Sequence, residues 1–274
     1  MRDVQNEPDL RRIPLRKVGV TGLRYPIDVL DKANGMQTTT GTADLFVNLP
    51  RHFKGTHMSR FVEIFHAYRK DLSMKRFLAM LEEVRRRLDA ERAFASVKFP
   101  FFIEKTAPVS GQPGLMCYDC GYEGEVFLRD PENGGGISRV FTVSVEVPVT
   151  TVCPCSKAIS RHGAHNQRGR VRVRVRNTGF FWIEDIISFV ESCASCGLYS
   201  VLKRKDEKFV TEHAYENPRF AEDLVREVYA GLKNAVSLSP PLCEKPFLWF
   251  SVEAENEESI HRHNAYAYAE YTSP

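Results

Sequence analysis

The sequence has no long apolar segment. None of its hydrophobic runs approaches the roughly 20 residues that a membrane-spanning helix needs. The first residues, 1–7, lack the apolar core of a secretion signal, and low-complexity tracts are absent. These absences predict a cytoplasmic protein that has no membrane partner.

The chain also has little net charge and an odd number of cysteines. Its formal net charge is +3 over 274 residues, which is too small to predict nucleic-acid binding by itself. Seven cysteines without an export signal argue against a disulfide framework. The 43% of hydrophobic and 27% of charged residues are typical of a globular protein with one large core or two smaller ones.

The sequence does contain one pattern of strands and helices that occurs twice. After an extension over residues 1–16, a first unit at 17–131 and a second unit at 132–274 each show the order strand, strand, helix, helix, strand, strand. Hairpins with helices grouped between them predict an α+β fold, in which helices cover one side of an antiparallel sheet.

Hydrophobic periodicity places the expected elements. Alternating apolar residues predict strands at 18–30, 36–49, 95–104, 115–128, 139–152, 168–176, 247–255 and 264–271. Helical spacing predicts helices at 58–65, 74–88 and 183–190. A further helix is expected to begin at Asn217-Pro218, an N-cap residue followed by proline.

The segment 147–169 carries the strongest chemical signal. Cys153 and Cys155 flank Pro154, and His165 follows on the same excursion between two strands. A thiolate and an imidazole brought together in this way are the parts of a metal site or of an activated nucleophile. Cys153 also fits a small buried hydrophobic residue, but the proline ends the strand and favours a functional role. His162 remains an alternative to His165.

Two other groups of residues have competing interpretations. The pairs Cys117/Cys120 and Cys193/Cys196 have the spacing of a four-thiolate zinc site, although a strand and a helix are poor places for one. Arginine alternates with valine over residues 168–176, which fits either a solvated stripe or a phosphate-binding surface. Together they define one alternative function, a non-enzymatic zinc module that binds nucleic acid.

Several acidic residues and histidines outside this segment are candidates for chemistry. Glu207 lies in a charged run and Glu222 lies opposite the apolar stripe of its helix, so both are expected to be solvated unless another subunit encloses them. Glu258, His261 and His263 lie between the last two strands, where they suit proton transfer or metal binding but also a solvated turn.

Several motifs in order along the chain resemble the prokaryotic type IB GTP cyclohydrolase I family. The matching stretches are 147–157 (VPVTTVCPCSK), 163–169 (GAHNQRG), 198–204 (LYSVLKR), 210–212 (VTE), 215–220 (YENPRF) and 258–265 (ESIHRHNA). The resemblance covers nearly the whole chain after the extension. It implies a tunnelling fold, in which tandem units assemble barrels between subunits, and a homotetramer with active sites at subunit interfaces.

The resemblance also assigns roles to individual residues. It implies a divalent metal, with zinc as first choice and manganese or iron(II) as alternatives. The implied metal ligands are Cys153, His165 and Glu207. The implied catalytic residues are Cys153, Cys155, Glu258 and His261. Glu222 is the carboxylate implied to anchor the guanine ring. From charge alone, Lys157 and Arg168 are candidates for binding the triphosphate.

The implied reaction is hydrolysis of GTP to 7,8-dihydroneopterin triphosphate and formate, the first step of tetrahydrofolate biosynthesis. The product can feed folate or a modified tRNA base, and no nucleic-acid partner is expected. A second alternative is a nitrile reductase of the same fold, which would use a cysteine and NADPH and would need no metal.

Overall fold

The computed structural model describes residues 10–51, 53–130 and 135–273. Most of the predicted extension at 1–16 therefore lies outside the described residues. No helix within these ranges is long and apolar enough to cross a membrane.

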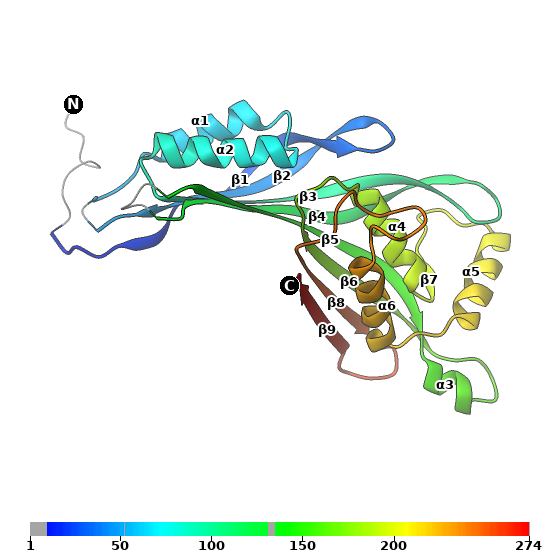
Figure 1. Ribbon diagram of the computed structural model, residues 1–274. Coiled ribbons are helices and arrows are strands. Elements are labelled where there is room, and N and C mark those ends of the chain that lie inside the picture. The colour runs from blue at the N-terminus through cyan, green and yellow to red at the C-terminus, as the bar shows by residue number, and fades with distance from the viewer. Residues whose placement is uncertain (1–9, 52, 131–134, 274) are drawn as a thin grey trace. The chain divides into compact units, whose positions relative to one another are not determined.

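The first half of the chain has the predicted order of elements (Figure 1). Its helices and strands are β1 (Leu15–Asp31), β2 (Gly35–Leu49), α1 (Met58–Tyr68), α2 (Met74–Arg87), β3 (Arg92–Thr106) and β4 (Pro113–Leu128). Strand alternation and helical spacing were sufficient to predict these elements, because each element has one buried face and one exposed face.

The second half contains more elements than predicted. They are β5 (Ile137–Val152), α3 (Pro154–Ile159), β6 (Asn166–Arg176), α4 (Ile183–Cys193), β7 (Cys196–Gly197), α5 (Arg204–Glu216), α6 (Ala221–Lys233), β8 (Trp249–Glu257) and β9 (Ala265–Thr272). The charged run that contains Glu207 lies in the first turns of α5.

The predicted helix start at Asn217-Pro218 is wrong. Asn217 ends α5, where its backbone N–H donates to the carbonyl oxygen of His213, and α6 begins at Ala221. A proline is common just after a helix because it cannot continue the helical hydrogen bonding, and the same dipeptide therefore also marks a helix end.

The strands hydrogen-bond in the order β1-β2-β3-β4-β5-β6-β8-β9, and the short β7 pairs with β5. The chain divides into two compact units, one formed by residues 1–100 and 121–143 and the other by residues 101–120 and 144–274. β3, β4 and β5 each contribute residues to both units. The spatial division therefore does not follow a single point in the chain.

In the first unit, α1 and α2 bury aromatic residues against the sheet. Phe77 of α2 is fully buried, and its ring contacts Tyr122 and Phe141 at centroid distances of 6.1 and 5.3 Å. In the second unit, α6 packs on β8 and β9. Phe250 of β8 is fully buried there and contacts the rings of Tyr229 and Tyr271 at 5.2 and 5.1 Å.

Replacement of Phe250 tests this packing. Phe250→Ala should lower the free energy of unfolding by about 3–5 kcal/mol, because the truncation leaves a cavity between α6 and the sheet. Val236→Ala is the control, since Val236 is 40% exposed and its loss should change stability by no more than about 0.5 kcal/mol. Equal effects in chemical denaturation of the two variants would contradict this description of the core.

Candidate active site

The first element of the site is the short excursion between β5 and β6. Cys153 directly precedes α3, and the Ser156 backbone N–H donates to its Sγ at 3.5 Å. The Ser156 hydroxyl donates to the Cys153 carbonyl oxygen at 3.1 Å. Cys153 is half-buried rather than packed in the core. Cys155, two residues later, is exposed.

The same excursion brings His165 to Cys153. The backbone N–H of Cys153 donates to the carbonyl oxygen of His165 at 3.1 Å, and the His165 N–H donates to Ser156 Oγ at 3.2 Å. The alternative histidine, His162, is exposed, and its backbone is bonded to Ser160 instead. Of the two histidines, His165 is therefore the one whose backbone is bonded to Cys153.

Helix α5 packs against this excursion through a small apolar cluster. Ala214 is buried with Val152, and Val210 and Ala164 pack on the same cluster. Val152 and Ala164 are the residues directly before Cys153 and His165. The buried face of α5 therefore lies against the residues that precede the two candidate ligands.

Glu207 lies on this face of α5 but is exposed. It precedes Val210 by three residues and Ala214 by seven, and residues at these spacings share one side of a helix. In the part of the chain that the structure describes, no three His, Cys, Asp or Glu side chains are grouped closely enough to hold a metal ion. The structure therefore links Cys153 to His165 through their backbones and does not bring Glu207 into a group with them.

The neighbouring Asp206 holds the start of α5 in place. It is fully buried and accepts hydrogen bonds from the backbone N–H groups of Val109, Ser110 and Lys203, each at 2.7–2.8 Å. The Ser110 hydroxyl donates to the same carboxylate at 2.6 Å. Burial alone would raise the pKa of Asp206, but the hydrogen bonds from Ser110, Lys203 and Val109 lower it well below its usual range.

The segment between α5 and α6 returns to the excursion. The backbone N–H of Arg219 donates to the Val152 carbonyl oxygen at 3.0 Å. Glu222 follows three residues later in the first turn of α6, where its side chain is exposed as predicted. Lys157 donates to the Tyr215 carbonyl oxygen and lies 4.4 Å from the centroid of the Tyr215 ring. Its ammonium thus already has partners on α5.

The turn between β8 and β9 lies at the same end of the sheet. Arg168 pairs in register with Glu257, the residue before Glu258, and His165 precedes Arg168 by three residues. His261 and His263 are exposed, and their rings stack with centroids 5.1 Å apart. Glu258 is half-buried. Register thus brings this turn near the start of β6.

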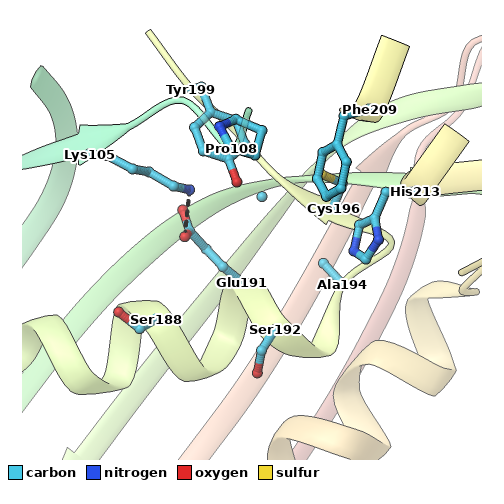
Figure 2. Close-up of a pocket in the computed structure, with 11 residues that line it drawn as sticks. Lys105, Pro108, Ser188, Glu191, Ser192, Ala194, Cys196, Tyr199, Phe209 and His213 are labelled. Carbon is cyan, nitrogen blue, oxygen red and sulfur yellow. Dashed lines mark hydrogen bonds and ion pairs between the residues drawn. The ribbon is translucent and has the colours of Figure 1, made fainter. Parts of the chain in front are cut away.

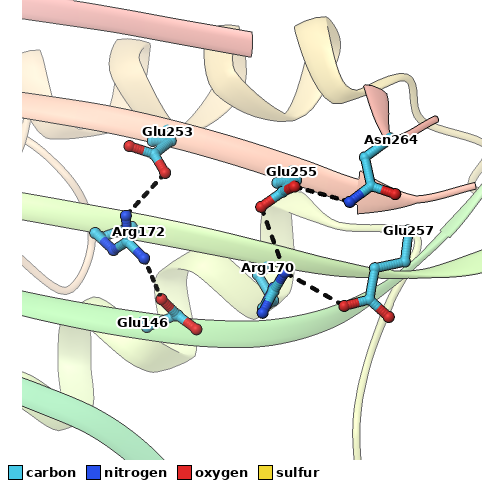
Figure 3. Close-up of polar contacts among 7 residues, drawn as sticks. All are labelled: Glu146, Arg170, Arg172, Glu253, Glu255, Glu257 and Asn264. Carbon is cyan, nitrogen blue, oxygen red and sulfur yellow. Dashed lines mark hydrogen bonds and ion pairs between the residues drawn. The ribbon is translucent and has the colours of Figure 1, made fainter. Parts of the chain in front are cut away.

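Two arginines of the β6 stripe, Arg170 and Arg172, form ion pairs with carboxylates of the adjacent strands (Figure 3). Arg172 donates to Glu146 at 2.7 Å and to Glu253 at 2.9 Å, and the hydrogen bond to Glu146 contributes most to raising the pKa of Arg172. Arg170 lies 3.3 Å from both Glu255 and Glu257. These carboxylates favour the structural interpretation of Arg170 and Arg172 over a phosphate-binding surface.

The four additional cysteines are not gathered into one group within the described ranges. Cys120 is buried near Glu184 at the start of α4, whereas Cys193 is the last residue of that helix. Burial raises the pKa of Cys120 and raises that of Cys193 to about 11, so both are protonated thiols at neutral pH. The four-thiolate zinc site is therefore not supported.

Sequence reasoning missed a pocket of about 340 Å³ beside α4 and α5 (Figure 2). Lys105 and Glu191 form a 2.7 Å ion pair in its wall, with only 18% and 13% of their side chains exposed. Lys105 also donates to the Leu198 carbonyl oxygen and lies 4.2 Å from the Tyr199 ring centroid, while Tyr118 donates to Glu191. Because both charges have these partners, the pair braces the fold around α4.

Comparisons with known proteins define the class. The fold is similar to the crystal structure of uricase from Arthrobacter globiformis, with a TM-score of 0.50, 8% identity, and coverage of 94% of this chain and 93% of that one. The chain therefore has a tunnelling fold, with an α+β antiparallel sheet.

The family follows from sequence comparison. The model of the type I GTP cyclohydrolase folE2 family matches residues 1–267. A GTP cyclohydrolase FolE2 from Syntrophus aciditrophicus (strain SB) is 53% identical over 270 residues, covering 98% of this chain and 99% of the relative. One from Desulfosudis oleivorans is 51% identical over 268 residues, covering 97% and 96%. The chain belongs to the type I GTP cyclohydrolase FolE2 family, and the predicted resemblance is confirmed.

The Asp206 contacts predict how the stability of the metal-free protein depends on pH. Because the folded pKa is lower than the unfolded value of about 3.9, the stabilisation is complete above that value and is lost as pH falls below it. Denaturation of the chelator-treated protein between pH 6 and 2 should show a smaller acid-induced loss for Asp206→Asn than for the unmodified chain. Parallel pH profiles for the two proteins would contradict the proposed contribution of Asp206.

Proposed function

We propose that this chain hydrolyses GTP to 7,8-dihydroneopterin triphosphate and formate, the step that opens tetrahydrofolate biosynthesis. The proposal rests on family membership. The family model matches residues 1–267, and the two relatives named above are 53% and 51% identical to this chain. The backbone hydrogen bond between Cys153 and His165 supports the proposal, since it brings a thiol-bearing and an imidazole-bearing residue together in one short excursion. The cytoplasm suits the free cysteines of the chain.

The proposed metal ligands are Cys153, His165 and Glu207. One thiolate, one imidazole and one carboxylate form a mixed donor set that fits zinc and also admits manganese or iron(II). A divalent ion bound there would lower the pKa of a water molecule so that hydroxide is available near neutral pH. Glu207 lies on the side of α5 whose apolar residues cluster with Val152 and Ala164, the residues before Cys153 and His165. This placement supports its inclusion.

Other residues are proposed to bind and protonate the substrate. Glu222 accepts hydrogen bonds from the guanine N1–H and 2-amino group, a donor pair that adenine lacks, so ATP would leave the carboxylate unpaired. His261, supported by Glu258, transfers a proton to the departing ring nitrogen, and Cys155 lies next to the reacting carbon. Arg168 and Lys157 are the proposed contacts of the triphosphate.

A second copy of the chain is proposed to complete the site, in a homotetramer. Glu207 and Glu222 are exposed in the single chain, although the chemistry assigned to them needs an enclosed site. β9 ends the strand order and presents Tyr266 and Tyr268, which are 59% and 50% exposed. An edge strand of this kind is suited to pairing with another chain. The nitrile reductase and the nucleic-acid module are not favoured by the family comparison.

Incubation with GTP tests the activity directly. The purified protein should convert GTP to a pterin that fluoresces after oxidation. Chelator treatment should abolish the reaction and added zinc, manganese or iron(II) should restore it. ATP should give no pterin. Absence of pterin from a folded, metal-loaded protein would refute the proposed function.

Replacement of Glu222 tests the guanine contact. Glu222→Gln should lower kcat/KM for GTP by about 100-fold or more, because the neutral amide loses two charge-assisted hydrogen bonds worth about 1.5–3 kcal/mol each. The metal content should be unchanged. Glu227→Gln, in the same helix, is the matched control. An unaltered kcat/KM in Glu222→Gln would remove the anchoring role.

A further inference from the structure

A buried hydrogen-bonded chain lies behind the candidate ligand His165. Nδ1 of His165 is 3.0 Å from Oε1 of Gln167. Nε2 of Gln167 in turn donates to Oγ1 of Thr151 at 3.0 Å. Gln167 is 8% exposed and Thr151 is 0% exposed, so water does not compete for these bonds.

Gln167 occupies a position that packing alone would give to an apolar residue. It begins the buried face of β6, which continues after Gly169 through Val171, Val173 and Val175. A buried amide destabilises a fold unless its donor and its acceptor both find partners. Thr151 and His165 supply these two partners, one at each end of the amide.

The direction of the amide determines which ring nitrogen carries the proton. With its NH₂ group donating to Thr151, Gln167 presents its carbonyl oxygen to His165. An oxygen there accepts a hydrogen bond, so the neutral imidazole holds its proton on Nδ1. Nε2 then keeps its lone pair and is the nitrogen able to bind a metal.

We infer that Gln167, oriented by Thr151, is a positioning residue that fixes the ring and the Nδ1–H tautomer of His165. Histidine ligands in metalloproteins generally donate their second ring N–H to a fixed acceptor, which holds the ring and raises its basicity. The inference deepens the proposed function, since it rests on His165 being a metal ligand. The tautomer, however, is a property of the metal-free chain.

The reverse arrangement makes the opposite prediction. If Thr151 donated to Oε1 and the NH₂ group of Gln167 donated to His165, Nδ1 would be unprotonated and the proton would lie on Nε2. His165 would then have to rearrange before binding a metal through that nitrogen. The two arrangements differ in one observable, the protonated nitrogen of His165.

Nitrogen NMR of the metal-free protein distinguishes them. Protein labelled with ¹⁵N-histidine is treated with chelator and measured at pH 8, and the His165 signals are identified by their absence from His165→Gln. The expected result is an Nδ1–H tautomer in the unmodified chain, its loss in Gln167→Leu, and its retention in Gln167→Glu, whose carboxylate also accepts from Nδ1–H. A predominant Nε2–H tautomer in the unmodified chain would overturn the inference without any variant.

Metal affinity supplies the second readout. In competition with a chelator, Gln167→Leu should bind zinc about 10–100-fold more weakly than the unmodified protein. Gln167→Glu should stay close to the unmodified affinity. A role in packing alone predicts the reverse order, because leucine is the better tolerated buried residue. Gln37→Leu, the same change in the first unit, controls for the substitution itself and should leave the affinity unchanged.

The outcomes separate this inference from the proposed function. An Nδ1–H tautomer that depends on Gln167, in a protein that does not turn over GTP, would support the positioning role and refute the activity. Turnover of GTP with unchanged tautomer and unchanged zinc affinity in Gln167→Leu would support the activity and overturn the positioning role.

Discussion

The hydrogen bond from the Cys153 N–H to the His165 carbonyl oxygen closes the excursion between β5 and β6, and the rest of the candidate site is arranged around it. Val152, one residue earlier, packs with Ala214 of α5 and accepts the backbone N–H of Arg219 just before α6. One short backbone segment therefore fixes the thiol, the imidazole and the approach of both helices that carry the proposed carboxylates.

Much of the fold could be predicted from the sequence, because a strand or helix with one apolar face shows apolar residues at its characteristic spacing. The placement of Cys153 and His165 on one short excursion could also be predicted, because a proline ends the strand next to Cys153 and the following strand begins soon after His165. Helix α5 was missed because its buried face is small. Only Asp206 and Ala214 are buried in it, and charged residues fill its first turns.

The remaining features depend on contacts that no local pattern encodes. Asp206 and Gln167 are ordinary polar residues in the sequence, and their importance follows from partners 96 and 16 residues away, Ser110 and Thr151. The alternation of arginine with valine could be read from the sequence. The carboxylate partners of Arg170 and Arg172, however, come from β5 and β8, and only the structure shows these ion pairs.

Cobalt(II) substitution tests most directly whether sulfur and imidazole at this excursion hold one metal ion. The cobalt-loaded protein should show a thiolate-to-cobalt charge-transfer band in the near ultraviolet. The band should persist in Cys155→Ala and disappear in Cys153→Ala, with weakened cobalt binding in His165→Ala. A band that survives Cys153→Ala, or cobalt binding that is indifferent to His165, would contradict the pairing of these two residues as metal ligands.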